Sequence, residues 1–201
     1  MQIIIKKTPE EHYFTTEKIT REAFWNLYKP GCDEHLVLHN LRNSNAYIDD
    51  LDLIALTQHE ISGHIISTRA IIKDEANNEY EVLCTGPISV LPSMQSKGIG
   101  SMLLRHSIEK AKELGYSGII LFGNPNYYQR FGFRNAEIYK ITTKDGQNFD
   151  PFMALELKEN SLENIKGSFF EAQEFTIKKE ELNEFDKNFP YKEKKKTDTQ
   201  L

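Results

Sequence analysis

The chain has 201 residues, of which 39% are hydrophobic and 27% charged, and its formal net charge at pH 7 is −5. This composition is typical of a globular protein, and the negative charge gives no basic field that would attract a nucleic acid. No apolar run approaches the roughly 18 residues that a membrane span needs. The charges of Met1-Gln-Ile-Ile-Ile-Lys-Lys follow its apolar residues, which is the wrong order for a signal peptide, so we expect a cytoplasmic protein.

One short strand and two helices are predicted before residue 50. Gln2 to Lys6 has the composition of an edge strand. Thr16 can cap a helix whose apolar side chains recur at helical spacing and which Pro30-Gly31 ends. Asp33 can cap a second helix, which ends near Asn43.

From residue 52 onward the hydrophobic period changes from helical to extended. Strands are predicted at Leu53 to Leu56, Ile61 to Ile72 and Tyr80 to Val90, because turn residues separate these apolar stretches. The connections are short. The three strands are therefore expected to form an antiparallel meander.

A helix and a buried strand come next. The helix is predicted from Gly98 to Leu114, with Gly115 in the position of a left-handed cap. Gly118 to Phe122 is a continuous apolar run, as in a strand that is buried on both faces. Because this strand follows a helix, we expect it to lie parallel to the Tyr80 to Val90 strand, which makes the sheet mixed.

The C-terminal part is predicted to be less regular. A helical turn is expected at Asn126 to Phe131, and strands are expected near Ala136 to Ile141 and Met153 to Leu157. These elements complete a single domain over residues 1–158. Residues 159–201 are expected to form a C-terminal extension that packs in part on the domain and ends in a flexible basic tail.

The two cysteines, Cys32 and Cys84, are far apart and lack metal-ligand spacing. We therefore expect neither a disulfide framework nor a metal site. Cys84 falls inside an apolar strand, where a cysteine usually serves as a small core residue.

The segment between Gly86 and Gly100 has the features of an anion site. It places a strand, a short arm and a glycine turn directly before a helix, whose first N–H groups are unpaired and lie at the positive end of the helix dipole. A dinucleotide fingerprint does not fit, because Leu103 stands where a third small residue is needed. A nucleotide-triphosphate loop does not fit either, because Lys97 precedes the glycine. A pyrophosphate remains the natural ligand.

The same residues resemble motif A of the GNAT superfamily of N-acetyltransferases. The likeness lies in Ile-x-Val-x-Pro at residues 88–92, followed by Gln-x-x-Gly-x-Gly at residues 95–100. The resemblance implies that acetyl-CoA is the co-substrate, with its pantetheine arm on the strand and its pyrophosphate on the glycine turn. The implied cofactor-binding residues are Ile88, Ser89, Val90, Gln95, Ser96, Lys97, Gly98, Ile99, Gly100 and Ser101.

A second segment, Tyr-Tyr-Gln-Arg-Phe-Gly-Phe at residues 127–133, resembles the Tyr-x-x-x-Gly-Phe motif of the same family and its compact form in a bacterial branch of predicted N-acetyltransferases. The resemblance places Tyr128 where many members keep the tyrosine that protonates the departing thiolate. Many members also carry an asparagine seven residues before this tyrosine, but here that position is Leu121. Asn124 is the nearest asparagine and the candidate for a contact with the pantetheine.

Acetyl transfer by direct attack needs an unprotonated amine, a polarised thioester carbonyl and an acid for the sulfur. A backbone N–H at the strand bulge near Val90 could hold the carbonyl oxygen, and Tyr128 is the candidate acid. The base is open. Glu81 is named as a candidate because family members with a side-chain base often draw it from this strand, and the alternatives are Glu60, His64 and Glu34. Arg42 and Arg130 could bind an acidic substrate.

The resemblance implies an α/β fold of the α+β type. Helices flank a mixed, mostly antiparallel sheet, which opens in a V between the strands that hold Val90 and Leu121. The implied function is acetyl transfer from acetyl-CoA to a primary amine of a small molecule, peptide or protein. The alternatives are an acetyl-CoA sensor without catalysis and an acyltransferase that uses another acyl-CoA. No nucleic-acid, membrane or metal partner is expected, and a homodimer is left open.

Overall fold

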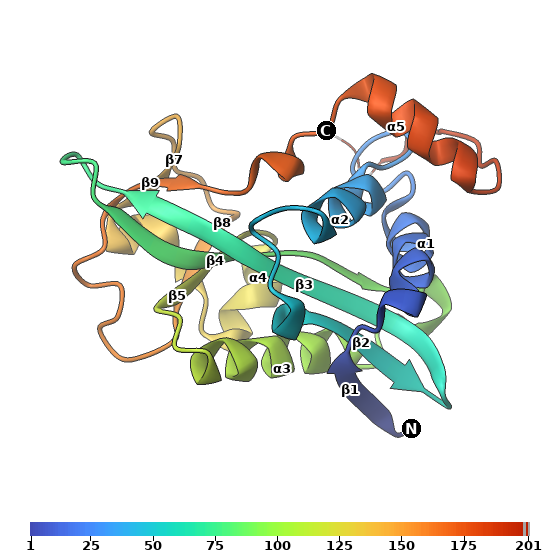
Figure 1. Cartoon of the computed structure of the whole chain (residues 1–201), viewed down its shortest axis with the longest axis horizontal. Coiled ribbons are helices and arrows are strands. Elements are labelled where there is room, and N and C mark those ends of the chain that lie inside the picture. Colours follow the sequence, from blue (N-terminus) through green and yellow to red (C-terminus); the bar gives the residue numbers. More distant parts are fainter. Residues whose placement is uncertain (199, 201) are drawn as a thin grey trace.

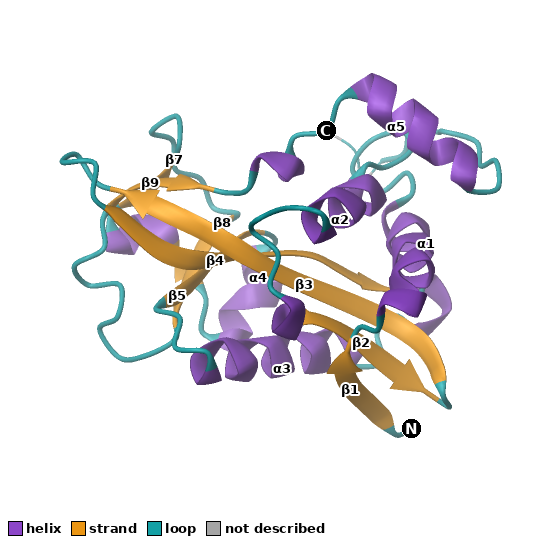
Figure 2. Ribbon diagram, viewed as in Figure 1, coloured by secondary structure: helices purple, strands orange, loops and turns teal. Residues whose placement is uncertain are grey.

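The computed structural model describes residues 1–198 and 200, and its centre is a nine-stranded sheet (Figure 1, Figure 2). The strands are β1 (Ile3–Lys7), β2 (Asp52–Thr57), β3 (Glu60–Lys73), β4 (Glu79–Val90), β5 (Gly118–Phe122), β6 (Arg134–Asn135), β7 (Ile141–Thr143), β8 (Phe152–Glu156) and β9 (Gly167–Phe170). The α-helices are α1 (Tyr13–Phe24), α2 (Glu34–Arg42), α3 (Ile99–Glu113), α4 (Pro125–Tyr128) and α5 (Lys179–Phe185).

The sheet is mixed and mostly antiparallel, as predicted. Its order is β1-β2-β3-β4-β5-β8-β6, and β9 pairs with the end of β3 and with β7. Strands β2 to β4 form the predicted meander, and β1 pairs antiparallel with β2 as the predicted edge strand. The α3 crossover places β5 parallel to β4, and β7 and β9 form a second parallel pair.

Strands β4 and β5 separate soon after they meet. They pair only at Leu83 with Ile119 and at Cys84 with Ile120, while β4 continues to Val90 beside β3. This is the predicted V-shaped opening. It leaves the last part of β4 with one free edge, and an unpaired edge offers backbone groups to a ligand.

Helices cover the two faces of the sheet. Helix α3 packs on one face, while α1 and α2 lie on the other (Figure 1). The side chains of β4 and β5 alternate between these faces. Leu83, Ile119 and Leu121 join the core beneath α3, whereas Cys84 and Ile120 join the core on the opposite face. Residues 118–121 are therefore buried on both faces, as their composition predicted, whereas Phe122 is exposed.

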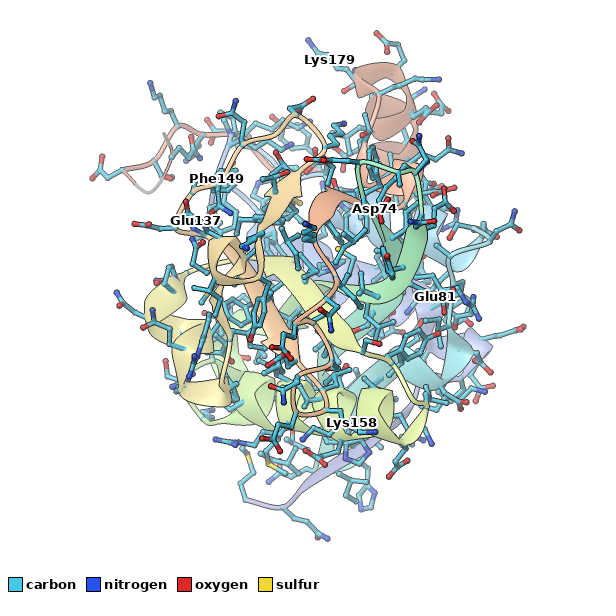
Figure 3. The ribbon with its side chains drawn as sticks, turned by 90° about the vertical axis from the view of Figure 1, so that its left-hand side faces the viewer. Asp74, Glu81, Glu137, Phe149, Lys158 and Lys179 are labelled. Atoms are coloured by element: carbon cyan, nitrogen blue, oxygen red, sulfur yellow. The ribbon has the colours of Figure 1, made fainter. Side chains whose placement is uncertain are left out.

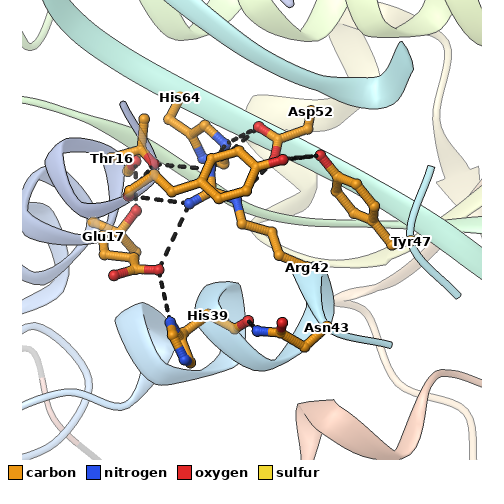
Figure 4. Close-up of polar contacts among 11 residues, drawn as sticks. Thr16, Glu17, His39, Arg42, Asn43, Tyr47, Asp52 and His64 are labelled. Carbon is orange, nitrogen blue, oxygen red and sulfur yellow. Dashed lines mark hydrogen bonds and ion pairs between the residues drawn. The ribbon is translucent and has the colours of Figure 1, made fainter. Parts of the chain in front are cut away.

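A buried polar network fixes α1 and α2 on the sheet (Figure 4). The guanidinium of Arg42 donates from Nε to Asp52 Oδ2 at 2.8 Å, and from Nη2 to Thr16 Oγ1 at 2.8 Å. His64 Nε2 lies 2.7 Å from Asp52 Oδ1. Glu17 Oε1 lies 3.7 Å from Arg42 Nη1. The network thus connects both helices to β2 and β3.

Two predicted elements differ from the structure. The first helix starts at Tyr13 rather than at Thr16, whose hydroxyl donates to Tyr13 O instead of capping the helix. This helix ends at Phe24, well before Pro30, because Asn26 takes a left-handed φ of 60° and its side chain accepts a hydrogen bond from the N–H of Gly31.

The predicted strand over 136–141 is wrong for most of its length. Ala136–Tyr139 forms a 3₁₀ helix, and only Ile141 enters β7. The Asn135 side chain accepts a hydrogen bond from the N–H of Glu137 at 2.8 Å, and such a local bond competes with strand pairing. Lys140 then ends the turn with a left-handed φ of 58°.

The chain beyond residue 158 follows the sheet and then crosses to α1 and α2 (Figure 1, orange to red). Leu162 and Phe169 are buried in the core. Phe185 in α5 packs against His35 and His39 of α2. The last part of the predicted basic tail, residues 199 and 201, lies outside the described residues.

No helix in the described part of the chain is long and apolar enough to cross a bilayer. Residues 1–198 and 200 contain no group of three or more His, Cys, Asp and Glu side chains that could hold a metal ion.

Candidate functional site

A cleft of about 1270 Å³ lies where β4 and β5 separate. It reaches from the start of α3 on one face of the sheet to α1 and α2 on the other. Most of the predicted cofactor residues line it, namely Ile88, Val90, Gln95, Ser96, Gly98, Ile99, Gly100 and Ser101, and so do Asn124 and Tyr128.

The start of α3 has the properties of an anion site. Gly98 precedes the helix with a left-handed φ of 85°, and a Cβ at this position would meet nothing within 4 Å. The first intrahelical bond runs from Met102 N to Gly98 O, so the N–H groups of residues 99–101 have no partner within the helix. The first turn contains no acidic side chain. An anion can therefore approach the positive end of the helix dipole.

Arg130 brings a positive charge to the same place. Its Nη2 lies 3.4 Å from Ser101 Oγ, and its guanidinium stacks 4.1 Å from the centre of the Tyr127 ring. A Cβ on Gly100 would lie 3.2 Å from Tyr127 Oη, so the first turn of α3 and this tyrosine are in close contact. Sequence reasoning had considered Arg130 for an acidic substrate, but the structure places it at the anion site. Its position two residues before the Gly132-Phe133 pair was the available signal.

The last residues of β4 expose backbone groups to the cleft. Val90 faces Gly63 across the ladder, and the N–H of Leu91 donates to Ser62 O at 2.9 Å. In antiparallel pairing this pattern turns the N–H and C=O of Val90 away from β3. The carbonyl of Val90 accepts a hydrogen bond from Gln95 Nε2 at 3.2 Å. The N–H of Val90 is thus directed toward the open edge, where a carbonyl oxygen could be bound.

The bulge of β4 lies farther from Val90 than expected. Ile65 pairs with Ile88 and Ser67 pairs with Thr85, so one extra residue falls between Thr85 and Ile88 on β4. The Gly86–Pro87 peptide in this bulge is cis. The bulge therefore precedes the segment from Ile88 to Val90 and does not include it.

Three predicted residues point away from the cleft. Ser89 is buried on the opposite side of β4, where its hydroxyl lies 3.0 Å from Thr20 Oγ1. The ammonium of Lys97 donates to Ser93 O at 2.9 Å. The side chain of Glu81 is 56% exposed at the outside of the sheet, 4.0 Å from Arg69 Nε (Figure 3). The structure does not bring Glu81 near Tyr128.

Tyr128 is held from three sides. Its ring packs edge-on against Tyr127 at 4.9 Å and against Phe133 at 5.7 Å. A Cβ on Gly123 would overlap the Tyr128 ring, so only glycine fits there. Desolvation by the surrounding protein raises the pKa of Tyr128, with a smaller contribution from the neighbouring Tyr127. The phenol is therefore protonated at neutral pH. Sequence reasoning missed Gly123, whose signal was a small residue directly after a strand.

Asn124 has a structural task. Its side chain accepts a hydrogen bond from the N–H of Asn126 at 3.0 Å and caps the short helix α4. Through that helix it helps to orient Tyr128. Asn124 also lines the cleft.

Of the remaining candidates for the base, only Glu34 lines the cleft. Glu60 is exposed at the start of β3 and does not line the cleft. His64 is fully buried in the Asp52 network, as is Arg42. Glu34, the first residue of α2, lines the cleft, and burial raises the pKa of its carboxyl. Glu171 also lines the cleft and was not considered from sequence, because it lies in the C-terminal extension without a motif.

Comparison with known proteins identifies the domain. Residues 53–135 match the model of the acetyltransferase (GNAT) domain. The uncharacterized N-acetyltransferase YjhQ of Escherichia coli K12 is 34% identical over 83 residues, which are 41% of this chain and 45% of YjhQ. The uncharacterized N-acetyltransferase YhbS of the same strain is 22% identical over 135 residues, which are 67% of this chain and 78% of YhbS. The match thus spans less than half of YjhQ.

Solved structures share the fold. A GNAT family acetyltransferase from Brucella melitensis, crystallised with acetyl-CoA, superimposes with a TM-score of 0.71 at 24% identity, covering 87% of this chain and 99% of that chain. YhbS from Escherichia coli, crystallised with CoA, gives a TM-score of 0.77 at 18% identity and covers 87% of this chain and 92% of that chain. This chain therefore has the fold of the GNAT acetyltransferases, and its residues 53–135 match the model of their domain.

Proposed function

We propose that this chain, which carries a GNAT acetyltransferase domain, transfers an acetyl group from acetyl-CoA to a primary amine. The observation that carries the proposal is the single cleft that joins the start of α3, the open edge of β4 and Tyr128. The two structural neighbours were crystallised with acetyl-CoA and with CoA. The residues of this chain fit the same ligand.

The start of α3 suits the pyrophosphate. Its free N–H groups and the guanidinium of Arg130 supply donors and positive charge, and Gly98 leaves the approach open. The edge of β4 suits the pantetheine arm, whose amides resemble the backbone of an added strand. The apolar side chains of Ile88 and Val90 lie beside Gly100 on the wall of the cleft.

Two groups that face the cleft suit the chemistry. Acetyl-CoA supplies the acetyl group as a thioester. The N–H of Val90 can bind the carbonyl oxygen, on which negative charge develops during attack. Tyr128 can donate its phenolic proton to the sulfur that leaves. A C–N bond forms and the C–S bond breaks. The proton that the amine nitrogen loses restores the phenol of Tyr128, so the products are an amide and the free thiol.

The test is release of the CoA thiol from acetyl-CoA against a panel of primary amines. We expect Tyr128→Phe to lower kcat by about 100-fold while leaving the KM for acetyl-CoA nearly unchanged, because general acid catalysis contributes roughly 10²–10⁴-fold. Tyr139→Phe is the matched control, since Tyr139 lies in the core outside the cleft. Binding of acetyl-CoA without turnover of any amine would favour a sensor, and loss of rate in both variants would remove Tyr128 from the mechanism.

A further inference from the structure

The charged side chains of the cleft are divided between its two ends. Among the described residues that line it, the charged ones are Glu34, Arg130 and Glu171. Arg130 lies at the start of α3, where the proposed cofactor site uses it. The two carboxylates lie on the opposite face of the sheet, where the cofactor needs no negative charge. They are therefore available to the acceptor.

Glu171 marks the apex of the cleft on that face. Its Oε2 is 4.0 Å from Cys84 Sγ, and Cys84 forms the last rung of β4 with Ile120 before the strands separate. The Cys84 side chain belongs to the core opposite α3. The Glu171 carboxylate thus lies beside the apex of the V, on the side away from the proposed pyrophosphate site.

Glu34 lies at the start of α2 on the same face. Its Oε2 accepts a hydrogen bond from the N–H of Asp33 at 3.1 Å, which fixes the carboxylate at the positive end of the helix dipole. Tyr28 lines the same cleft, and burial raises the pKa of its phenol, with a smaller contribution from the Glu34 carboxylate.

Neither carboxylate forms a close ion pair with the described part of the protein. Within residues 1–198 and 200, no ion pair within 4.0 Å involves Glu34 or Glu171. Desolvation raises the pKa of both carboxyls, and the charges of Lys29 and Lys144 oppose this rise at Glu34 and Glu171, respectively. Glu34 is half-buried and Glu171 is exposed, so both can receive a cationic ligand from the cleft.

The wall around the carboxylates is aromatic and accessible. Tyr28 is 64% exposed and Phe122 is 44% exposed, and both line the cleft together with Phe24 and Phe175. Exposed aromatic rings gathered in a cleft are typical of a binding site for an apolar group. Aromatic faces also attract cations.

We infer that this half of the cleft binds the acceptor as a cationic amine with an apolar or aromatic body and no acidic group, its positive charge bound by Glu34 and Glu171, and that one of these carboxylates accepts the proton that the ammonium loses before its nitrogen attacks. The inference rests on the proposed function for the site of transfer. An acceptor with its own carboxylate or phosphate places a like charge beside two glutamates and is excluded. The specificity thus follows from charge as well as from shape.

The probes are two pairs of amines that differ by one carboxylate: phenethylamine against phenylalanine, and 1,5-diaminopentane against lysine. Binding of each amine is measured by calorimetry with and without CoA, and kcat/KM is measured with acetyl-CoA. In the wild type we expect the member without a carboxylate to bind about tenfold more tightly in each pair and to have the higher kcat/KM.

The variants are Glu34→Gln and Glu171→Gln, which remove charge at nearly constant shape. Each is expected to weaken phenethylamine binding by about tenfold and to reduce the discrimination against phenylalanine, without changing the affinity for acetyl-CoA. Glu174→Gln is the control, because Glu174 lies three residues after Glu171 and does not line the cleft. Thermal unfolding verifies that all three variants are folded.

Equal or tighter binding of the carboxylate-bearing amines would overturn the inference. So would Glu34→Gln and Glu171→Gln variants whose amine affinities equal that of the Glu174→Gln control. Failure of the proposed function can be distinguished from failure of this inference. If the function fails, acetyl-CoA does not bind and no amine causes thiol release. The amine affinities measured by calorimetry still test whether Glu34 and Glu171 bind the positive charge.

Discussion

Asp52 is the residue on which the attachment of α1 and α2 depends most. It is fully buried, and its two carboxylate oxygens bind the Arg42 guanidinium and His64. Burial alone would raise the pKa of this carboxyl, but His64 and Arg42 hold it well below its usual range. The carboxylate therefore stays ionised, and Arg42 depends on it for neutralisation.

Asp52→Ala is expected to lower the free energy of unfolding by about 3–5 kcal/mol, because it leaves Arg42 buried without its main counter-charge. Urea unfolding measures the change. Asp49→Ala is the control, since the Asp49 pair with Lys7 is about half exposed and should contribute less than about 1 kcal/mol. Similar losses in the two variants would show that the network is not the principal attachment.

Among single residues, the sequence predicted the site residues that belong to motifs. It did not predict the site residues that reach the cleft only through the folding of distant segments. Tyr128 and Gly98 were predicted because each stands at a fixed distance from other motif residues. Glu171 lies more than forty residues beyond Tyr128, and its position depends on β9 pairing with β3. Glu81 was drawn from the correct strand, but it precedes the paired residues Leu83 and Cys84, whereas the cleft opens after them.

Helix α3 is the element that most directly tests the cofactor site, because both of its ends carry a glycine in the same conformation. Gly98 has a φ of 85° and Gly115 has a φ of 84°, and a Cβ on either would meet nothing within 4 Å. The two positions are therefore equally strained by an L-residue. Only Gly98 lines the cleft.

Gly98→Leu and Gly115→Leu should reduce stability by similar amounts, about 1–2 kcal/mol. Gly98→Leu should also raise the Kd for acetyl-CoA by at least about tenfold, because its side chain would occupy the approach to the free N–H groups. Gly115→Leu should leave this Kd unchanged. Equal affinities in the two variants, measured by calorimetry, would place the ligand elsewhere.

Elements with strong local signals were predicted well, and those decided by side-chain bonds were not. Helix α3 was predicted nearly to its ends because a glycine precedes it and another follows it. The segment from Ala136 was predicted as a strand, but a hydrogen bond from the Glu137 N–H to the Asn135 side chain turns it into a 3₁₀ helix. The spacing of hydrophobic residues, from which the strand was predicted, contains no information about such a side-chain hydrogen bond.

At the scale of the whole molecule, the C-terminal segment is part of the folded unit. It supplies β9, buries Leu162 and Phe169, and places Glu171 and Phe175 on the cleft wall. The sequence predicted only partial packing, because β9 has four residues and no alternating pattern long enough to identify it. The mixed sheet was predicted from the helix that precedes the apolar strand at 118–122, and its V-shaped opening was predicted from the resemblance.

Deletion of residues 159–201 is expected to abolish the cooperative thermal transition. The loss of two fully buried side chains, at about 2–3 kcal/mol each, and of the β9 pairing removes much of a typical margin of about 5–15 kcal/mol. Deletion of residues 191–201 alone should keep the transition, since Tyr191 is 90% exposed and the tail pairs mainly at the surface. A cooperative transition near the wild-type Tm in the longer deletion would show that residues 1–158 fold independently.

The central claim is that the cleft between β4 and β5 binds acetyl-CoA, and calorimetric titration of acetyl-CoA into the wild-type chain tests it most directly. We predict saturable binding at one site per chain, with a Kd of roughly 1 μM to 1 mM and competition by CoA. An absence of heat and of displacement up to millimolar acetyl-CoA would contradict the claim.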